Sequence, residues 1–132
     1  MNLQGCITPV EKILGINFIQ TNEVYSASYE DRTLRIFQRN NVFFLESSLG
    51  HPLTDEVASS SLLGNLLQFN LKRMRFLEGN LYLDNTTQQL FFQQCYELNT
   101  LQPPDLETKL DDFLASVEVI EQKFFPKKLT NE

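Results

Sequence analysis

His51 is the only imidazole in the sequence, so any histidine-based acid–base or nucleophilic chemistry has a single candidate. It lies in a Gly-His-Pro loop, with Asp55 and Glu56 close by in the chain. The side chains that could act beside it as nucleophiles are Ser47, Ser48 and Cys95. A catalytic triad is defined by a geometry that closeness in sequence does not supply. We therefore interpret His51 as a solvent-facing loop residue and keep a small hydrolase centred on it as an alternative.

Acidic pairs near the C-terminus are the other groups with a conceivable catalytic use. Two carboxylates can share general acid–base work when burial separates their pKa values. Asp111 and Asp112, like Glu118 and Glu121, lie on the polar side of a predicted helix, which favours a solvated surface. The sequence has no glycine-rich phosphate loop and no Cys or His spacing typical of a metal site. These patterns predict a protein that is not an enzyme, with no catalytic residue, cofactor or metal.

The chain has 132 residues and a formal net charge of −6, from 11 basic and 17 acidic residues. This length predicts one domain over residues 1–132, with the polar segment 126–132 as a frayed tail. The negative charge argues against a nucleic-acid partner, since such binding relies on cations that neutralise phosphates. Two cysteines, Cys6 and Cys95, are too few for a disulfide framework. No apolar run approaches a membrane span, so we expect a soluble cytoplasmic protein without membrane insertion.

The first part of the chain predicts a short helix and three strands. Thr8-Pro9-Val10-Glu11 is typical of a helix N-terminus with proline in the first turn, and Gly15 favours the end of that helix. An earlier turn over residues 1–7 is the alternative, which Gly5 disfavours. Asn40-Asn41 suits a two-residue hairpin turn between strands. The predicted strands are Val24–Tyr29, Thr33–Gln38 and Val42–Glu46. Short strands joined by tight turns indicate an antiparallel meander.

The second and third of these strands differ in what their faces carry. Leu34 and Ile36 are expected on one face of the second strand, with Arg35 and Phe37 on the other. The third strand is apolar on both faces, which predicts a position inside the sheet or under cover on both sides.

A long helix is predicted over residues 58–76, and its apolar surface is unusually wide. At about 100° per residue this surface spans roughly 220°, whereas a helix that packs on one core shows a stripe of a little over 100°. The apolar residues are Leu62, Leu63, Leu66, Leu67, Phe69, Leu71, Met74, Phe76 and Leu77. The excess favours a helix that also packs against a second copy of the chain, in an isologous contact. A helix enclosed between its own sheet and the last helix is the alternative.

A second hairpin and a closing helix complete the predicted fold. Strands are expected over Asn80–Leu83 and around Leu90–Tyr96, joined by a turn at 84–87. After Pro103-Pro104, an apolar stripe from Leu106 to Phe124 predicts the last helix. The element order is α-β-β-β-α-β-β-α. We therefore predict an α+β fold with a twisted antiparallel sheet and three helices.

Four segments of this pattern carry a family resemblance: a leucine-rich helix, a strand that ends in aspartate, an apolar strand and a closing helix. They are Leu62–Asn70, Gly79–Asp84, Gln89–Gln94 and Leu106–Glu121. In these segments and in its element order, the chain resembles the class I type III secretion chaperones of the CesT (Tir chaperone) family. The first helix departs from that family's longer one, because Gly5 and Pro9 interrupt it.

The resemblance implies a bacterial cytoplasmic homodimer that binds the N-terminal segment of a secreted effector and keeps it soluble and secretion-competent without ATP. A heterodimer stays open, because some members of the family form one. Carried onto this sequence, the dimer interface would consist of Leu63, Leu66, Leu67, Asn70, Leu71 and Met74. The effector-binding residues would be Val10, Ile13, Leu14, Leu34, Ile36 and Phe44. A small apolar-ligand-binding α+β module is a further hypothesis, suggested by the Phe-rich strands.

Overall fold

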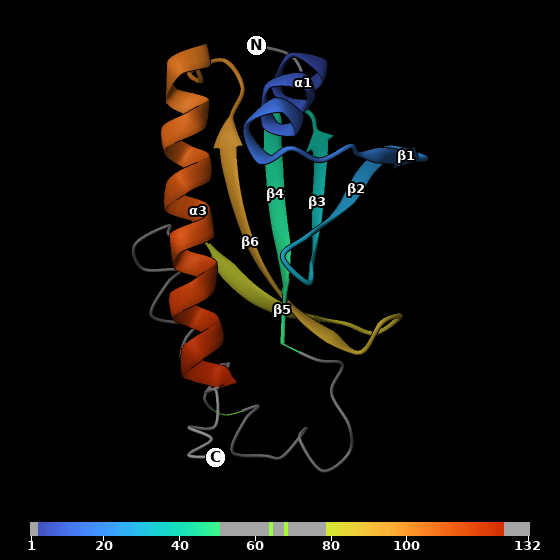
Figure 1. Cartoon of the computed structure of the whole chain (residues 1–132), viewed down its shortest axis with the longest axis vertical. Coiled ribbons are helices and arrows are strands. Elements are labelled where there is room, and N and C mark those ends of the chain that lie inside the picture. The colour runs from blue at the N-terminus through green and yellow to red at the C-terminus, as the bar shows by residue number, and fades with distance from the viewer. Residues whose placement is uncertain (1–2, 51–63, 65–67, 69–78, 126–132) are drawn as a thin grey trace.

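The computed structural model describes residues 3–50, 64, 68 and 79–125. Its helices and strands are α1 (Leu3–Leu14), β1 (Ile19–Thr21), β2 (Val24–Tyr29), β3 (Arg32–Arg39), β4 (Val42–Leu49), β5 (Asn80–Asp84), β6 (Gln89–Glu97) and α3 (Pro103–Phe124). The six strands form one antiparallel sheet in the order β1-β2-β3-β4-β6-β5. Figure 1 shows α3 running alongside β6, and α1 over the end of the sheet where β3 leads into β4. The predicted α+β fold with an antiparallel sheet is confirmed.

Alternation along the strands divides their side chains between two faces of the sheet. Leu34 and Ile36 of β3 are fully buried, whereas the intervening Arg35 and Phe37 are partly buried. The face of Leu34 and Ile36, here called the core face, packs against both described helices in one apolar cluster. Its large members include Phe43, Leu45, Leu49, Leu81, Leu90, Phe92, Leu110 and Phe113. We call the opposite face, which carries Arg35 and Phe37, the pocket face.

β4 lies between β3 and β6, which confirms the prediction that this strand is inside the sheet. It ends at Leu49 rather than at Glu46, because two serines continue the strand in a buried position. The Ser48 hydroxyl accepts a hydrogen bond of 2.8 Å from the backbone of Thr33, and the Ser47 hydroxyl donates one of 3.1 Å to the Ser48 carbonyl. Such bonds remove the main cost of burying a hydroxyl.

The start of α1 corrects the prediction that this helix begins at Thr8-Pro9. The helix begins at Leu3 and continues through Pro9. Proline inside a helix removes one backbone hydrogen bond, and burial of Cys6 and Val10 in the core offsets that loss. The predicted end at Gly15 is confirmed, because Gly15 takes a φ of 68° and its backbone donates to the Glu11 carbonyl at 2.8 Å.

β1 has no counterpart among the predicted strands. Its three residues are all exposed, so they carry no apolar alternation that a sequence pattern could detect. The strand exists because Ile19–Thr21 pairs with the backbone of β2. Glu11 supports the approach to it, since its Oε2 accepts a hydrogen bond of 2.7 Å from the backbone of Phe18.

Glu121 corrects the prediction of a solvated acidic surface on the last helix. Its Oε1 accepts a hydrogen bond of 2.7 Å from Arg32 Nη2, and its Oε2 accepts one of 2.8 Å from the backbone of Gly50. The hydrogen bond to Glu121 raises the pKa of the Arg32 guanidinium. Arg32 begins β3 and Gly50 follows β4, so Glu121 ties the end of α3 to both strands.

The predicted helix over residues 58–76 lies outside the described residues apart from Gly64 and Gln68, which are both helical. The predicted hairpin of β5 and β6 is confirmed, with its turn at 85–88 rather than 84–87 because Asp84 still pairs with Gln89. The last helix begins at Pro103, where the carboxylate of Asp105 accepts a hydrogen bond of 3.3 Å from the Gln102 backbone. This pair caps the first turn of α3.

Candidate binding site

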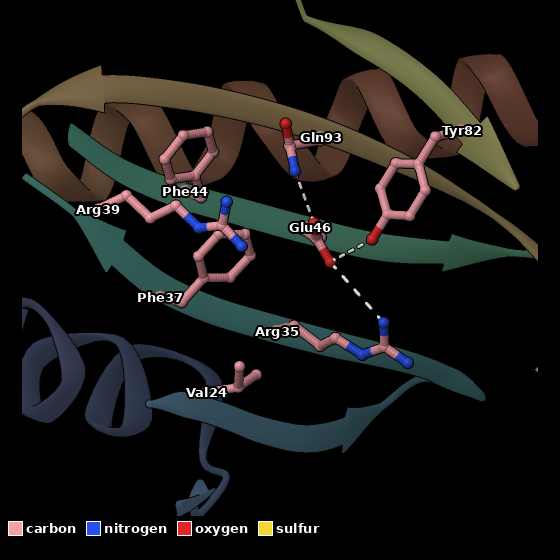
Figure 2. Close-up of a pocket in the computed structure, with 8 residues that line it drawn as sticks. All are labelled: Val24, Arg35, Phe37, Arg39, Phe44, Glu46, Tyr82 and Gln93. Carbon is pink, nitrogen blue, oxygen red and sulfur yellow. Dashed lines mark hydrogen bonds and ion pairs between the residues drawn. The ribbon is translucent and has the colours of Figure 1, made fainter. Parts of the chain in front are cut away.

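The pocket face carries a pocket of about 480 Å³ that is open to solvent. Its lining side chains come from five strands, and they are Val24, Arg35, Phe37, Arg39, Phe44, Glu46, Tyr82 and Gln93. Figure 2 shows that the aromatic rings of Phe37 and Phe44 lie to one side, with Glu46 and its polar partners to the other. The pocket therefore has an apolar wall and a polar wall.

The apolar wall is built by direct cross-strand pairing. Phe37 of β3 is the register partner of Phe44 of β4, and their rings stack with centroids 4.9 Å apart and planes 8° from parallel. Aromatic pairs on one face of a sheet stabilise the strand pairing and remove apolar ring surface from water. Val24 of β2 extends this surface, and the guanidinium of Arg39 lies 5.8 Å from the centre of the Phe37 ring.

The polar wall is centred on Glu46, which is 2% exposed. Its Oε1 accepts a hydrogen bond of 2.6 Å from Gln93 Nε2, and its Oε2 accepts one of 2.7 Å from the Tyr82 hydroxyl. Arg35 Nη1 lies 3.9 Å from Oε2, and Figure 2 marks all three interactions. A buried carboxylate is tolerated when donors of this kind satisfy it. Burial and then the bond to Glu46 raise the pKa of Tyr82, so its hydroxyl stays a donor at neutral pH.

Arg35 links the polar wall to the edge strand β5. Its Nη1 donates a hydrogen bond of 2.8 Å to Asp84 Oδ2, and its guanidinium lies 4.2 Å from the centre of the Phe91 ring. Burial alone would raise the pKa of Asp84, but the hydrogen bonds from Arg35 and from the Thr86 backbone outweigh burial and lower it. The charge of Arg35 is therefore compensated inside the fold.

The pocket combines a hydrogen-bonded carboxylate with a stacked pair of aromatic rings. Its carboxylate is held by neighbouring donors, and its lining includes no cysteine, serine or histidine that could serve as a nucleophile or base. Within the described ranges, no group of three His, Cys, Asp or Glu side chains could hold a metal ion. The stacked rings and Val24 instead offer apolar surface to a partner's side chain.

The structure distributes the six predicted effector-binding residues over different environments. Val10, Leu34 and Ile36 are buried in the core, where a partner cannot contact them in this conformation. Ile13 is 40% exposed on α1, and Leu14 is partly buried beside the core. Phe44 lies on the opposite face of the sheet, in the pocket. The six residues therefore do not form one groove.

Most of the pocket residues were not among the predicted site residues. Arg35, Phe37 and Arg39 follow from the alternation in β3, which already placed Arg35 and Phe37 opposite Leu34 and Ile36. Tyr82 and Gln93 could not be found in that way, because they reach the pocket only through the strand order β4-β6-β5.

The six predicted dimer residues Leu63, Leu66, Leu67, Asn70, Leu71 and Met74 lie outside the described residues. His51 does so as well. In the part of the chain that the structure describes, neither helix is long and apolar enough to cross a membrane.

Residues 5–121 match the model of the Tir chaperone protein (CesT) family. The match covers most of the chain, so the chain belongs to this family, and the predicted membership is confirmed. A search of curated protein sequences finds no significant match.

Solved structures share the fold at low sequence identity. The crystal structure of the ExsC-ExsE complex has 14% identity and a TM-score of 0.74, and the match covers 98% of this chain and 100% of that chain. The HopA1-SchA chaperone-effector complex has 13% identity and a TM-score of 0.62, with 92% and 98% covered. The ExoT-SpcS complex from Pseudomonas aeruginosa has 15% identity and a TM-score of 0.55, with 89% and 97% covered. These similarities establish the fold.

Proposed function

We propose that the chain is a homodimeric chaperone of type III secretion in the bacterial cytoplasm. It binds an N-terminal segment of an effector and keeps that segment soluble and ready for secretion, without ATP. The observation that carries this proposal is the match of residues 5–121 to the Tir chaperone family. The fold shared with a chaperone-effector complex and the open aromatic pocket support it.

Effector contact is assigned to the accessible members of the predicted set. Ile13 and Leu14 on α1 and Phe44 in the pocket offer apolar contacts at separate places on the surface. Val10, Leu34 and Ile36 support these places from the core. A disordered segment loses chain entropy when it becomes ordered, and separated apolar anchors offset that loss while holding the segment extended.

The dimer is assigned to the apolar surface of residues 63–74. An apolar surface too wide for one core is removed from water when two copies pair about a two-fold axis. Substitution of Leu67 or Leu71 by glutamate places a charge in that contact, so we expect dissociation to monomers in sedimentation velocity experiments. A wild-type protein that sediments as a monomer at micromolar concentration would contradict the assignment.

The decisive test of function is capture of a partner from the native cytoplasm, followed by limited proteolysis to map its protected segment. We expect protection of a segment near the N-terminus of a secreted protein, with or without ATP. Ile13→Glu should weaken capture, because it charges a proposed contact. Val119→Glu is the matched control, since Val119 is an exposed apolar residue on α3, 69% exposed. Equal capture by both variants removes Ile13 from the contact surface, and protection of no such segment refutes the chaperone function.

The pocket volume favours one further candidate function, the binding of a small apolar ligand. Sites for small molecules commonly measure about 300–1,000 Å³, and this pocket lies in that range. Native mass spectrometry of the purified protein tests this candidate. A copurified small molecule that Phe44→Ala releases would support it, and protein masses without any adduct would count against it.

A further inference from the structure

The two walls of the pocket differ in whether their charged side chains form ion pairs and hydrogen bonds with neighbouring residues. On the polar wall, Glu46 is bound by three side chains, and Arg35 pairs with Asp84. On the apolar wall, the guanidinium of Arg39 is exposed and lies over the Phe37 ring. Among the described residues, no carboxylate forms an ion pair with Arg39. The pocket therefore presents an apolar surface beside an exposed guanidinium that forms no ion pair with a described residue. Outside this site, the carboxylate that shares a pocket lining with Arg39 is that of Glu23, which is not within ion-pair distance.

We propose that the pocket selects an acidic apolar sequence in the effector segment. In this proposal, which rests on the proposed function, an aromatic or branched aliphatic side chain packs on Phe37, Phe44 and Val24. A neighbouring Asp or Glu of the same segment pairs with Arg39.

The charges around the pocket indicate whether the effector residue beside the apolar anchor is acidic or basic. A basic side chain would need Glu46, but that carboxylate is 2% exposed and already accepts two short hydrogen bonds. It would also meet the positive charge of Arg39 at the rim. The net charge of −6 acts weakly here, because salt at about 0.1 M screens charges beyond about 10 Å. The near field of Arg39 therefore sets the preference.

The shape of the apolar wall favours a peptide side chain as its occupant. The rings of Phe37 and Phe44 stack on each other on neighbouring strands and border a pocket that is open to solvent. Arginine that lies over an aromatic ring keeps its planar donors free at the edge, where a carboxylate can bind in a bidentate manner. Anchor and charge thus lie side by side, as consecutive side chains of a bound segment would require.

Selection from a phage-displayed library of random linear peptides tests the proposal and does not require the effector to be identified. The targets are the wild-type protein, Arg39→Glu and Lys109→Glu. The last is the matched control, because it makes the same charge change at an exposed residue of α3. We expect wild type and Lys109→Glu to enrich an apolar residue beside Asp or Glu. Arg39→Glu should instead enrich Lys or Arg at that position.

Binding constants of one selected synthetic peptide complete the test. Arg39→Glu should weaken binding about fivefold to tenfold, and replacing the peptide's acidic residue by lysine should restore binding to this variant. Phe44→Ala should weaken binding about tenfold or more, because it removes the centre of the apolar wall. Circular dichroism of each variant verifies the fold before measurement.

Several results overturn the proposal. The first is that the wild-type protein enriches no peptide. The second is that wild type and Arg39→Glu enrich the same charge beside the apolar residue. The third is that Phe44→Ala binds the selected peptide as tightly as wild type. A captured effector that binds Arg39→Glu and Phe44→Ala as tightly as wild type overturns the pocket proposal and leaves the chaperone function standing. Failure to protect any effector segment refutes both.

Discussion

The two faces of the sheet are made from alternate residues of the same strands, yet they are built on different physical principles. On the core face, apolar side chains such as Leu34 and Phe92 are fully removed from water by α1 and α3. On the pocket face, Glu46 is buried in a hydrogen-bonded network and Phe44 borders an open pocket. The comparison predicts that substitutions on the core face mainly lower stability, whereas substitutions on the pocket face also change the polar network and the proposed peptide binding.

The largest expected effect is on the core face. Phe113 of α3 is fully buried and stacks on Phe92 of β6, with ring centroids 5.7 Å apart. Phe113→Ala removes that contact and leaves a cavity, so we expect a loss of about 3–5 kcal/mol in the free energy of unfolding. Urea denaturation followed by circular dichroism measures it.

Peptide binding by the folded fraction of Phe113→Ala should stay at the wild-type level if the two faces act separately. A loss of stability below about 1 kcal/mol, or weaker binding in the folded protein, would break the proposed separation of the faces.

An intermediate effect is expected from the buried network of the pocket face. Glu46→Ala leaves the Tyr82 hydroxyl and the Gln93 amide without their acceptor, which should cost about 2–4 kcal/mol in unfolding free energy. Tyr82→Phe removes one donor and should cost about 1 kcal/mol.

A double-mutant cycle with Glu46→Ala and Tyr82→Phe then sharpens the comparison. We expect a coupling energy of at least about 0.5 kcal/mol, because the two groups share one hydrogen bond. Strictly additive losses would show that the polar wall does not act as a network.

The smallest effect is electrostatic and depends on pH. The pKa of Asp84 is lowered in the folded protein, so its ionised form stabilises the fold above the unfolded-state pKa of about 3.9. This contribution is lost as the pH falls through the lower, folded-state value. Asp84→Asn should therefore be about 1 kcal/mol less stable than wild type near pH 7, with a difference that shrinks in acid.

Urea denaturation at several pH values measures this difference between wild type and Asp84→Asn. Asp111→Asn, at an exposed position of α3, serves as the control. The assignment to the bond between Asp84 and Arg35 fails if the control shows the same dependence on pH.

The extent of successful prediction follows the range of the interactions involved. β2 is found at its predicted bounds, and the turn at Asn40 adopts its expected left-handed backbone, because both depend on neighbouring residues. The start of α1 was misplaced, because burial of its first turns outweighs the preference of Pro9 for a helix N-terminus. β1 was missed because its pairing is made by the backbone.

The candidate site shows the same division. Alternation placed Arg35 and Phe37 together on one face, which is correct. The family resemblance named Phe44 together with Leu34 and Ile36 as effector-binding residues, whereas β4 presents Phe44 on the other face of the sheet. Glu121 was interpreted as solvated, because its partner Arg32 lies 89 residues away in the chain.

The sequence by itself determined the α+β class, the order along the chain of the strands β2 to β6 and the face on which most apolar residues lie. These features arise from local preferences and from the periods of helices and strands. Only the tertiary structure decided that Glu46 meets Tyr82 and Gln93, and that Arg39 borders the same pocket with no ion pair from the described residues. Such contacts depend on the lateral order of the strands, which brings distant segments together and which no local pattern contains.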